Sequence, residues 1–152
     1  MSHVVEVDLS GRIEMTNGDT ALAFANGISS SILIQSTVKQ DCIRILRRRG
    51  FIGPVLYNQF FAIGLFFLLK DHIDNLSSII LDYEYQGREN KIKEYLINLL
   101  RRGNYIISTD QIQYLHIGKN SPAHELALKT FRGEEKPNKK LKVEEVIGEF
   151  RI

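Results

Sequence analysis

The chain has 152 residues, of which 43% are hydrophobic and 25% are charged, as expected for one ordinary globular domain. This composition excludes a disordered tail, a collagen-like fibre and a disulfide mini-protein. The 20 basic and 18 acidic side chains leave a net charge of +2, so charge alone does not identify a nucleic-acid binder. The single cysteine, Cys42, excludes an internal disulfide and a cysteine zinc cluster, and we expect a reducing cytoplasm.

No membrane segment is expected. The N-terminus lacks the basic stretch and apolar run of a signal peptide. The most apolar stretch, residues 51–69, contains an unbroken apolar core over residues 60–69 only, which is about half a membrane span. We therefore expect a helix that is buried in a protein core.

The N-terminal part predicts three strands and two helices. Strands are expected over 4–8, 20–25 and 30–35, and the Gly-containing turns between them indicate an antiparallel meander. The first strand is expected to end at its acid, Asp8. The capping-box spacing of Thr37 and Gln40 predicts a helix over 38–49 that ends at Gly50, and Pro54 can open the buried helix, which runs to about Lys70.

The second half alternates strands with helices. Strands are expected over 78–83 and 112–117, one helix is closed by Gly103, and another is capped by Ser121. Strands that alternate with helices demand a mixed or parallel sheet covered on both faces. The predicted fold class is therefore α/β, with a mixed sheet of about five strands and helices on both faces.

The C-terminal 20 residues differ from the rest. Residues 1–132 are expected to form the domain, whereas 133–152 form a charged linker followed by a docking helix. The apolar stripe of that helix consists of Val143, Val146, Ile147 and Phe150. The stripe, or the apolar helix near residue 60, could also serve a homodimer interface.

Acidic residues at the ends of two predicted strands form the candidate functional site. Asp8 and Asp82 fall where parallel strands end, and ligands bind at the carboxyl ends of such strands. Glu6 would share a face with Asp8, and Glu84 with Asp82. Converging carboxylates repel one another unless a cation neutralises them, and their oxygens suit Mg²⁺ or Mn²⁺. Two such ions can clamp both oxygens of a phosphodiester displacement.

His124, in the first turn of the last strand-connected helix, fits the same site. A helix N-terminus disfavours the protonated imidazole and so favours the form that binds metals. Structural alternatives stay open at this point: His124 as a surface or capping residue, Asp8 in an Asx-turn, and Asp82 as the end of a strand.

The element order and three segments carry a resemblance. Residues 4–11 (VVEVDLSG) resemble the first strand of RNase H-like domains, and residues 79–85 (IILDYEY) are similar to the fourth strand of that family. Residues 116–127 (HIGKNSPAHELA) look like its last strand, polar loop and final helix. The resemblance implies a two-metal nuclease in which Asp8, Asp82 and His124 are the catalytic metal ligands, aided by Glu6 or Glu84.

One departure bears on that expectation. Typical RNases H carry a catalytic Glu on the helix before the fourth strand, but the buried helix has no acid between Asn58 and Leu69. This argues against an ordinary RNase H and leaves an Asp-Asp-His arrangement.

Basic residues indicate where a nucleic acid would lie. Arg47, Arg48 and Arg49 end the first helix, and Lys119 lies in the polar loop. Such groups can contact phosphates, although basic residues at a helix end also complement the helix dipole. Three functions remain: a metal-dependent nuclease, a non-catalytic nucleic-acid-binding or assembly module on the same fold, and a small-molecule or nucleotide enzyme. The last is disfavoured because the chain has no Gly-rich phosphate loop.

Overall fold

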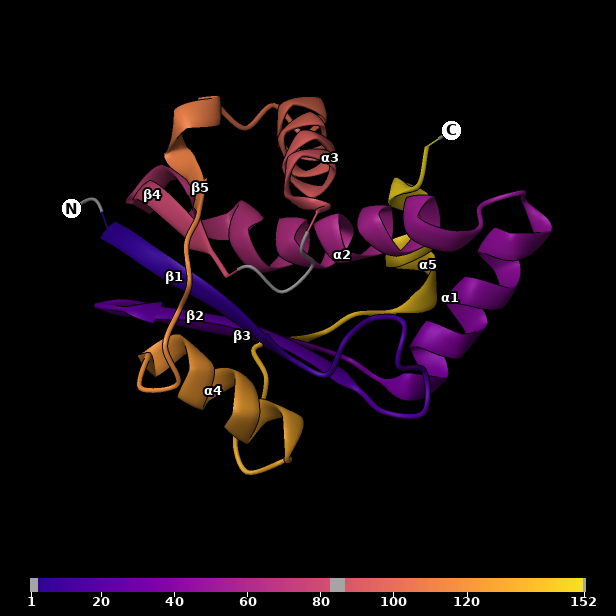
Figure 1. The fold of residues 1–152 in the computed structure, drawn as a ribbon, viewed down its shortest axis with the longest axis horizontal. Coiled ribbons are helices and arrows are strands. Elements are labelled where there is room, and N and C mark those ends of the chain that lie inside the picture. The colour runs from indigo at the N-terminus through magenta and orange to yellow at the C-terminus, as the bar shows by residue number, and fades with distance from the viewer. Residues whose placement is uncertain (1–2, 83–86, 152) are drawn as a thin grey trace.

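The computed structural model describes residues 3–82 and 87–151. They form one mixed β-sheet and the helices that pack around it (Figure 1). Within these residues the sheet has six strands in the order β5-β4-β1-β2-β3-β6. The strands are β1 His3–Ser10, β2 Thr20–Asn26, β3 Ile28–Ile34, β4 Leu76–Leu81, β5 Ile112–Tyr114 and β6 Lys139–Lys140. The helices are α1 Ser36–Arg48, α2 Gly53–Leu69, α3 Glu89–Arg102, α4 Pro122–Phe131 and α5 Val143–Glu149. The α/β class is confirmed.

The predicted antiparallel meander is present in β1, β2 and β3. Gly27 adopts a φ of +78°, a left-handed conformation that favours glycine, and so allows the tight turn between β2 and β3. The prediction that the first strand ends at Asp8 is wrong by two residues. Leu9 and Ser10 still pair with β2, so Asp8 lies within the strand and not after it.

The parallel half of the sheet is built on β1. Strand β4 lies beside β1 and runs parallel to it, with Val7 opposite Leu81, as the sequence predicts. Strand β5 is parallel to β4 but ends at Tyr114, three residues earlier than predicted. Beyond Tyr114, the N–H of Leu115 still donates to the carbonyl of Leu81, and the N–H of Ile117 donates to Oδ1 of Asp82 at 2.9 Å.

Helix α1 begins at Ser36, and the predicted capping box is wrong. Neither Thr37 nor Gln40 caps the helix, because the N–H of Ser36 donates to Oδ1 of Asp19 at 2.8 Å. The first turn of α1 is therefore capped from the loop that precedes β2.

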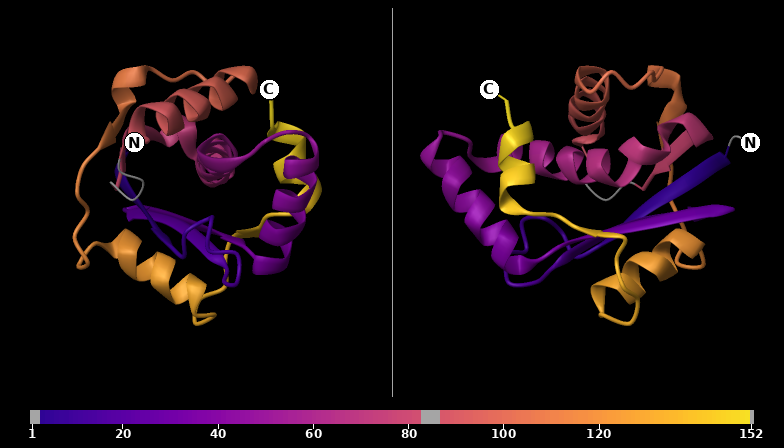
Figure 2. Two further views of the ribbon diagram at one scale, coloured as in Figure 1. Left: turned by 45° about the vertical axis from the view of Figure 1, so that its right-hand side comes forward. Right: turned by 180° about the vertical axis from the view of Figure 1, so that it is seen from behind.

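Helices cover both faces of the sheet. Helix α2 packs on one face against β2 and β3, and α4 packs on the other against β1, β2 and β3 (Figure 2). Alternation along β1 follows this division: Val5 and Val7 belong to the hydrophobic core, whereas Glu6 and Asp8 contact the first turn of α4. The sequence pattern of β1 thus separates a core face from a polar face.

Helix α2 is the buried helix that the sequence predicts. With the turn that follows, it forms Gly53–Asn75, within the described residues the one helix long and apolar enough to cross a membrane. Sixty-seven per cent of its most apolar stretch is buried inside the protein, which is compatible with a core helix of a soluble protein. Gly64 allows the close approach to β2, because a Cβ there would lie 2.8 Å from Cδ1 of Leu22.

The sheet has six strands and not the predicted five, because the C-terminal tail contributes one. The predicted charged linker after residue 132 contains β6, which pairs in parallel with the edge strand β3. Asn138 starts this pairing, since its Oδ1 accepts the N–H of Ser31 at 2.9 Å and its own N–H donates to the carbonyl of Ser31. Helix α5 follows and packs on α1 and α2. Val146 and Phe150 of its apolar stripe are buried against the same chain.

Candidate active site

Asp8 is the central residue of the candidate site. Its side chain is only 5% exposed, in the middle of the sheet on the face that α4 covers. Oδ1 accepts the N–H of Leu9 at 2.8 Å, and Oδ2 lies 2.8 Å from Nδ1 of His124. Because an ionised carboxylate only accepts hydrogen bonds, Nδ1 carries the hydrogen when Asp8 is ionised. In the neutral ring, Nε2 is then the nitrogen with the lone pair.

Helix α4 holds His124 in this position through a second contact with β1. Ser121 is the N-cap of α4, and its Oγ accepts the N–H of Ala123 at 3.2 Å. The same hydroxyl donates to Oε1 of Glu6 at 3.1 Å. Glu6 and Asp8 are two residues apart on one face of β1, so both carboxylates lie against the N-terminal turn of α4. Negative charge at a helix N-terminus is favourable.

Asp82 follows β4 directly, beside Asp8. The parallel register pairs Val7 with Leu81, so the next position on each neighbouring strand is an aspartate. Strands that are hydrogen-bonded to each other lie about 4.8 Å apart. Both aspartates line a small cavity of about 10 Å³, whose apolar walls include Phe61 and Leu65 of α2. A space of this size holds about one water molecule.

The donor set suits a hard divalent cation in its chemistry. The 2.8 Å contact between Asp8 Oδ2 and His124 Nδ1 is a hydrogen bond, so Nε2 is the ring nitrogen that could bind a metal. Asp82 supplies a further carboxylate at the position beside Asp8 in the strand register. Nevertheless, among the described residues no group of three or more His, Cys, Asp or Glu side chains is arranged to hold a metal ion. The arrangement therefore offers two neighbouring carboxylates and an imidazole, and not a complete set of metal ligands.

The other expected site residues lie in different surroundings. Glu84 lies outside the described residues. Glu6 lies on the predicted face, and its Oε1 accepts the hydroxyl of Ser121. Lys119 is exposed in the loop between β5 and α4, the loop that Asp82 holds through Ile117.

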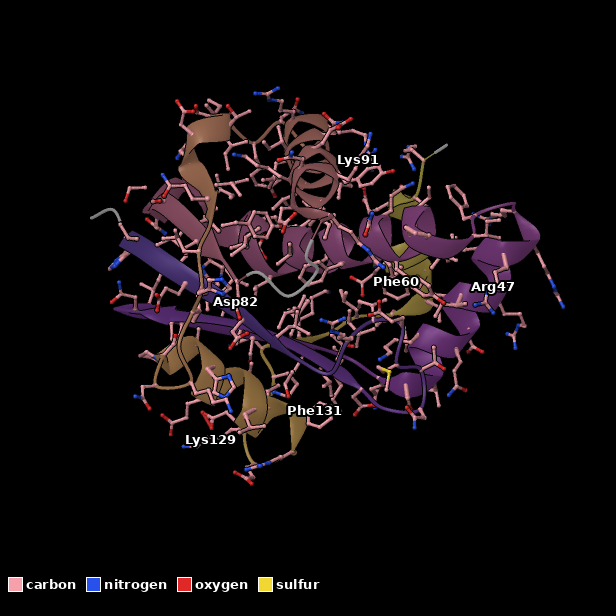
Figure 3. All side chains as sticks on the ribbon, in the orientation of Figure 1. Arg47, Phe60, Asp82, Lys91, Lys129 and Phe131 are labelled. Carbon is pink, nitrogen blue, oxygen red and sulfur yellow. The ribbon has the colours of Figure 1, made fainter. Side chains whose placement is uncertain are left out.

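The three arginines of α1 do not form one patch. Arg47 and Arg48 line a cavity of about 390 Å³, where Arg47 Nη2 donates to the hydroxyl of Tyr57 at 3.1 Å. Arg49 lines a different cavity, of about 520 Å³. Asp82 and Arg47 also lie at well-separated places in the molecule (Figure 3). A nucleic acid that contacts both would have to extend across the protein.

Lys39 is a supporting residue that sequence reasoning missed. Its fully buried ammonium donates to the carbonyls of Arg12 and Met15 and to Oγ1 of Thr20, at 3.1, 2.8 and 3.0 Å. It thereby fixes the loop that follows β1. Burial lowers the pKa of Lys39 from 10.5 to about 8, although nearby acids, including Asp19, oppose this shift. The available signal was its helical spacing, three residues before the buried Cys42.

Comparisons with protein-family models, curated proteins and solved structures found no match to this chain.

Proposed function

We propose that this protein is a metal-dependent nuclease on an RNase H-like fold, which hydrolyses phosphodiester bonds of a nucleic acid by a two-metal mechanism. The observation that carries the proposal is the buried carboxylate of Asp8, bonded to His124 and adjacent in strand register to Asp82. The antiparallel meander followed by parallel β4 and β5 supports the proposed fold, because the resemblance depends on that order of elements.

The burial of Asp8 supports a cation in particular. Moving a carboxylate out of water is costly unless it is paired. Within the described part of the chain, the ionisable partner of Asp8 is the imidazole of His124, and no lysine or arginine pairs with it. A second carboxylate at Asp82 adds repulsion. Mg²⁺ or Mn²⁺ would offset both the desolvation of Asp8 and its repulsion from Asp82, and such an ion is the cofactor that we propose.

Each side chain has a defined role in this proposal. Asp8 and Asp82 would hold the metals through carboxylate oxygens, and His124 would add an imidazole nitrogen. Glu6 and Glu84 are further candidate ligands. When bound, the ions would supply an activated water and stabilise the leaving oxygen. Ser121 positions His124 from the start of α4, because its hydroxyl both caps the helix and contacts Glu6.

Basic side chains would hold the nucleic acid. Arg47, Arg48, Arg49 and Lys119 are exposed, as contact with phosphates requires. They belong to α1 and to the loop before α4, so we propose an extended contact.

We also propose a cytoplasmic location. Its support is Cys42, which is a free and buried thiol, as is usual in a reducing compartment.

A cleavage assay tests the proposal. The chain is incubated with single strands, duplexes, RNA–DNA hybrids and four-way junctions, in Mn²⁺ or in EDTA. We expect cleavage in Mn²⁺ alone and its loss in Asp8→Asn, which keeps the size of the side chain and removes the charge. Asp74→Asn, at an exposed acid after α2, is the matched control and should stay active. Calorimetry should show Mn²⁺ binding that Asp82→Asn abolishes. If all four substrates survive in Mn²⁺, catalysis is refuted.

A second candidate is a non-catalytic nucleic-acid-binding or assembly module on the same fold. The observation that favours it is the lack of any acid in α2, Gly53–Leu69, where RNase H-like nucleases typically contribute a carboxylate. Retention of a nucleic acid in a gel-shift assay, without cleavage and without Mn²⁺ binding, would support this function in place of the first.

A further inference from the structure

A second cavity of the described structure lies away from the candidate active site. It has a volume of about 520 Å³ and is lined by residues of the α1–α2 loop, α2, α3, the end of α5 and the tail that follows. It shares no lining residue with the cavity of Asp8 and Asp82. Its volume is within the range of pockets that bind small molecules. We call it the arginine cavity, because Arg49, Arg102 and Arg151 line it.

The arginine cavity has an excess of positive charge. Its three arginines come from three separate elements, and Glu149 is the one acid among its lining residues. Arg102 Nη2 donates to Oε1 and to the carbonyl oxygen of Glu149, both at 2.8 Å. Arg151 Nη1 donates to the carbonyls of Gly148 and Phe150, which are uncharged. Arg49 and Arg151 thus have no carboxylate partner among the described residues, and the cavity is complementary to an anion.

The tail is held in place over this cavity by a buried amide. Gln59 of α2 is 7% exposed, and its Nε2 donates to the carbonyl of Arg151 at 3.1 Å. The N–H of Arg151 donates back to Oε1 of Gln59 at 3.4 Å. This reciprocal pair fixes the backbone that carries Arg151, so the cation is positioned before any ligand arrives. Such preorganisation lowers the entropic cost of binding.

The rest of the lining suits a planar ring. Ile52 is 68% exposed and Val55 is also exposed, although both are apolar, and the half-buried ring of Tyr95 lies on the same cavity. The exposed amide of Asn98 offers both a donor and an acceptor. An apolar wall, an amide and a cationic rim are the groups that bind, respectively, the face of a base, its edge and a phosphate.

We propose that the arginine cavity binds a nucleoside monophosphate. Its phosphate lies at Arg49 and Arg151, and its base lies against Val55 and Tyr95 with its edge toward Asn98. Arginine side chains bind phosphate through paired N–H groups and so replace the Gly-rich loop that this chain lacks. The proposal does not depend on the nuclease activity, because the two cavities have no residue in common.

Calorimetry with the full chain tests this site. The four ribonucleoside monophosphates are titrated in EDTA, so that no metal at Asp8 can hold their phosphate. At least one should bind with a Kd below 1 mM. The corresponding nucleoside and inorganic phosphate should each bind at least tenfold more weakly, because each lacks half of the contacts.

Two exposed arginines of the same region give a matched pair of variants. Arg49→Ala should weaken nucleotide binding at least tenfold, whereas Arg44→Ala, at a residue that lines the other cavity, should leave it unchanged. Both residues are exposed, and circular dichroism verifies that both variants fold. The proposal is overturned if no monophosphate binds at 1 mM, if inorganic phosphate binds as tightly as the nucleotide, or if the two variants behave alike.

Discussion

Replacement of Lys39 by Met removes a buried charge while it keeps the length of the side chain. Lys39 is fully buried, and its ammonium donates to two carbonyls of the loop between β1 and β2 and to the hydroxyl of Thr20 in β2. This loop follows the strand that carries Asp8, so the lysine supports the candidate active site without contact to it. We expect the effect of Lys39→Met on stability to depend strongly on pH.

The pKa of Lys39 gives the size and sign of that dependence. A fall from 10.5 to about 8 corresponds to about 3 kcal/mol between the protonation states. Because the folded pKa is the lower one, the unfolded chain binds more protons between pH 8 and pH 10.5, and stability rises with pH across this window. From pH 7 to pH 10 this group should add about 2–3 kcal/mol to the free energy of unfolding. The Met variant lacks this gain.

Urea unfolding at pH 7, 8, 9 and 10 measures the difference between the wild type and Lys39→Met. Burial raises the pKa of Cys42 to about 12, and this lowers stability above about pH 9, but it does so in both proteins and cancels in the difference. Lys91→Met makes the same change at an exposed lysine of α3 and should show no comparable rise. A difference for Lys39→Met that stays constant to within about 0.5 kcal/mol would refute the reasoning, since the linkage requires several times more.

Two further substitutions test the packing. Phe150→Ala should lower the free energy of unfolding by about 3–5 kcal/mol in urea titrations, because the ring is buried and packs edge-on against Phe51 at 5.2 Å; an unchanged midpoint would mean that the tail does not dock. Gly64→Ala should cost about 1–3 kcal/mol, because the new Cβ would meet Leu22 at 2.8 Å and this outweighs the gain in helix propensity. Gly148→Ala, at a helical glycine with open space around it, is the control and should instead stabilise by up to about 1 kcal/mol.

Most of the elements could be predicted because their signals are local. The apolar run before Asp82 predicts a buried parallel strand, and this strand lies beside β1. Ser121 and Pro122 predict the start of α4 to the residue, since an N-cap side chain and a proline at the first helical position act within one turn. His124 is therefore correctly placed in a first helical turn by sequence alone.

The contacts between distant segments could not be predicted. The 2.8 Å contact of His124 with Asp8 depends on how α4 crosses the sheet, which no local pattern specifies. The cap of α1 comes from Asp19, outside the helix, so the spacing of Thr37 and Gln40 misled the prediction. Strand β6 consists of two lysines, which have low β propensity, and it forms because the edge of β3 offers unpaired backbone groups.

Helix α4 is connected at both ends to strands of the same sheet, and this explains how a short helix can position the side chain of His124. At its N-terminus, Ser121 and His124 contact the two carboxylates of β1. After its C-terminus, Asn138 pairs with Ser31, and the chain joins β3 as β6. Rotation of α4 would break both contacts of its first turn with β1, so the imidazole stays beside Asp8.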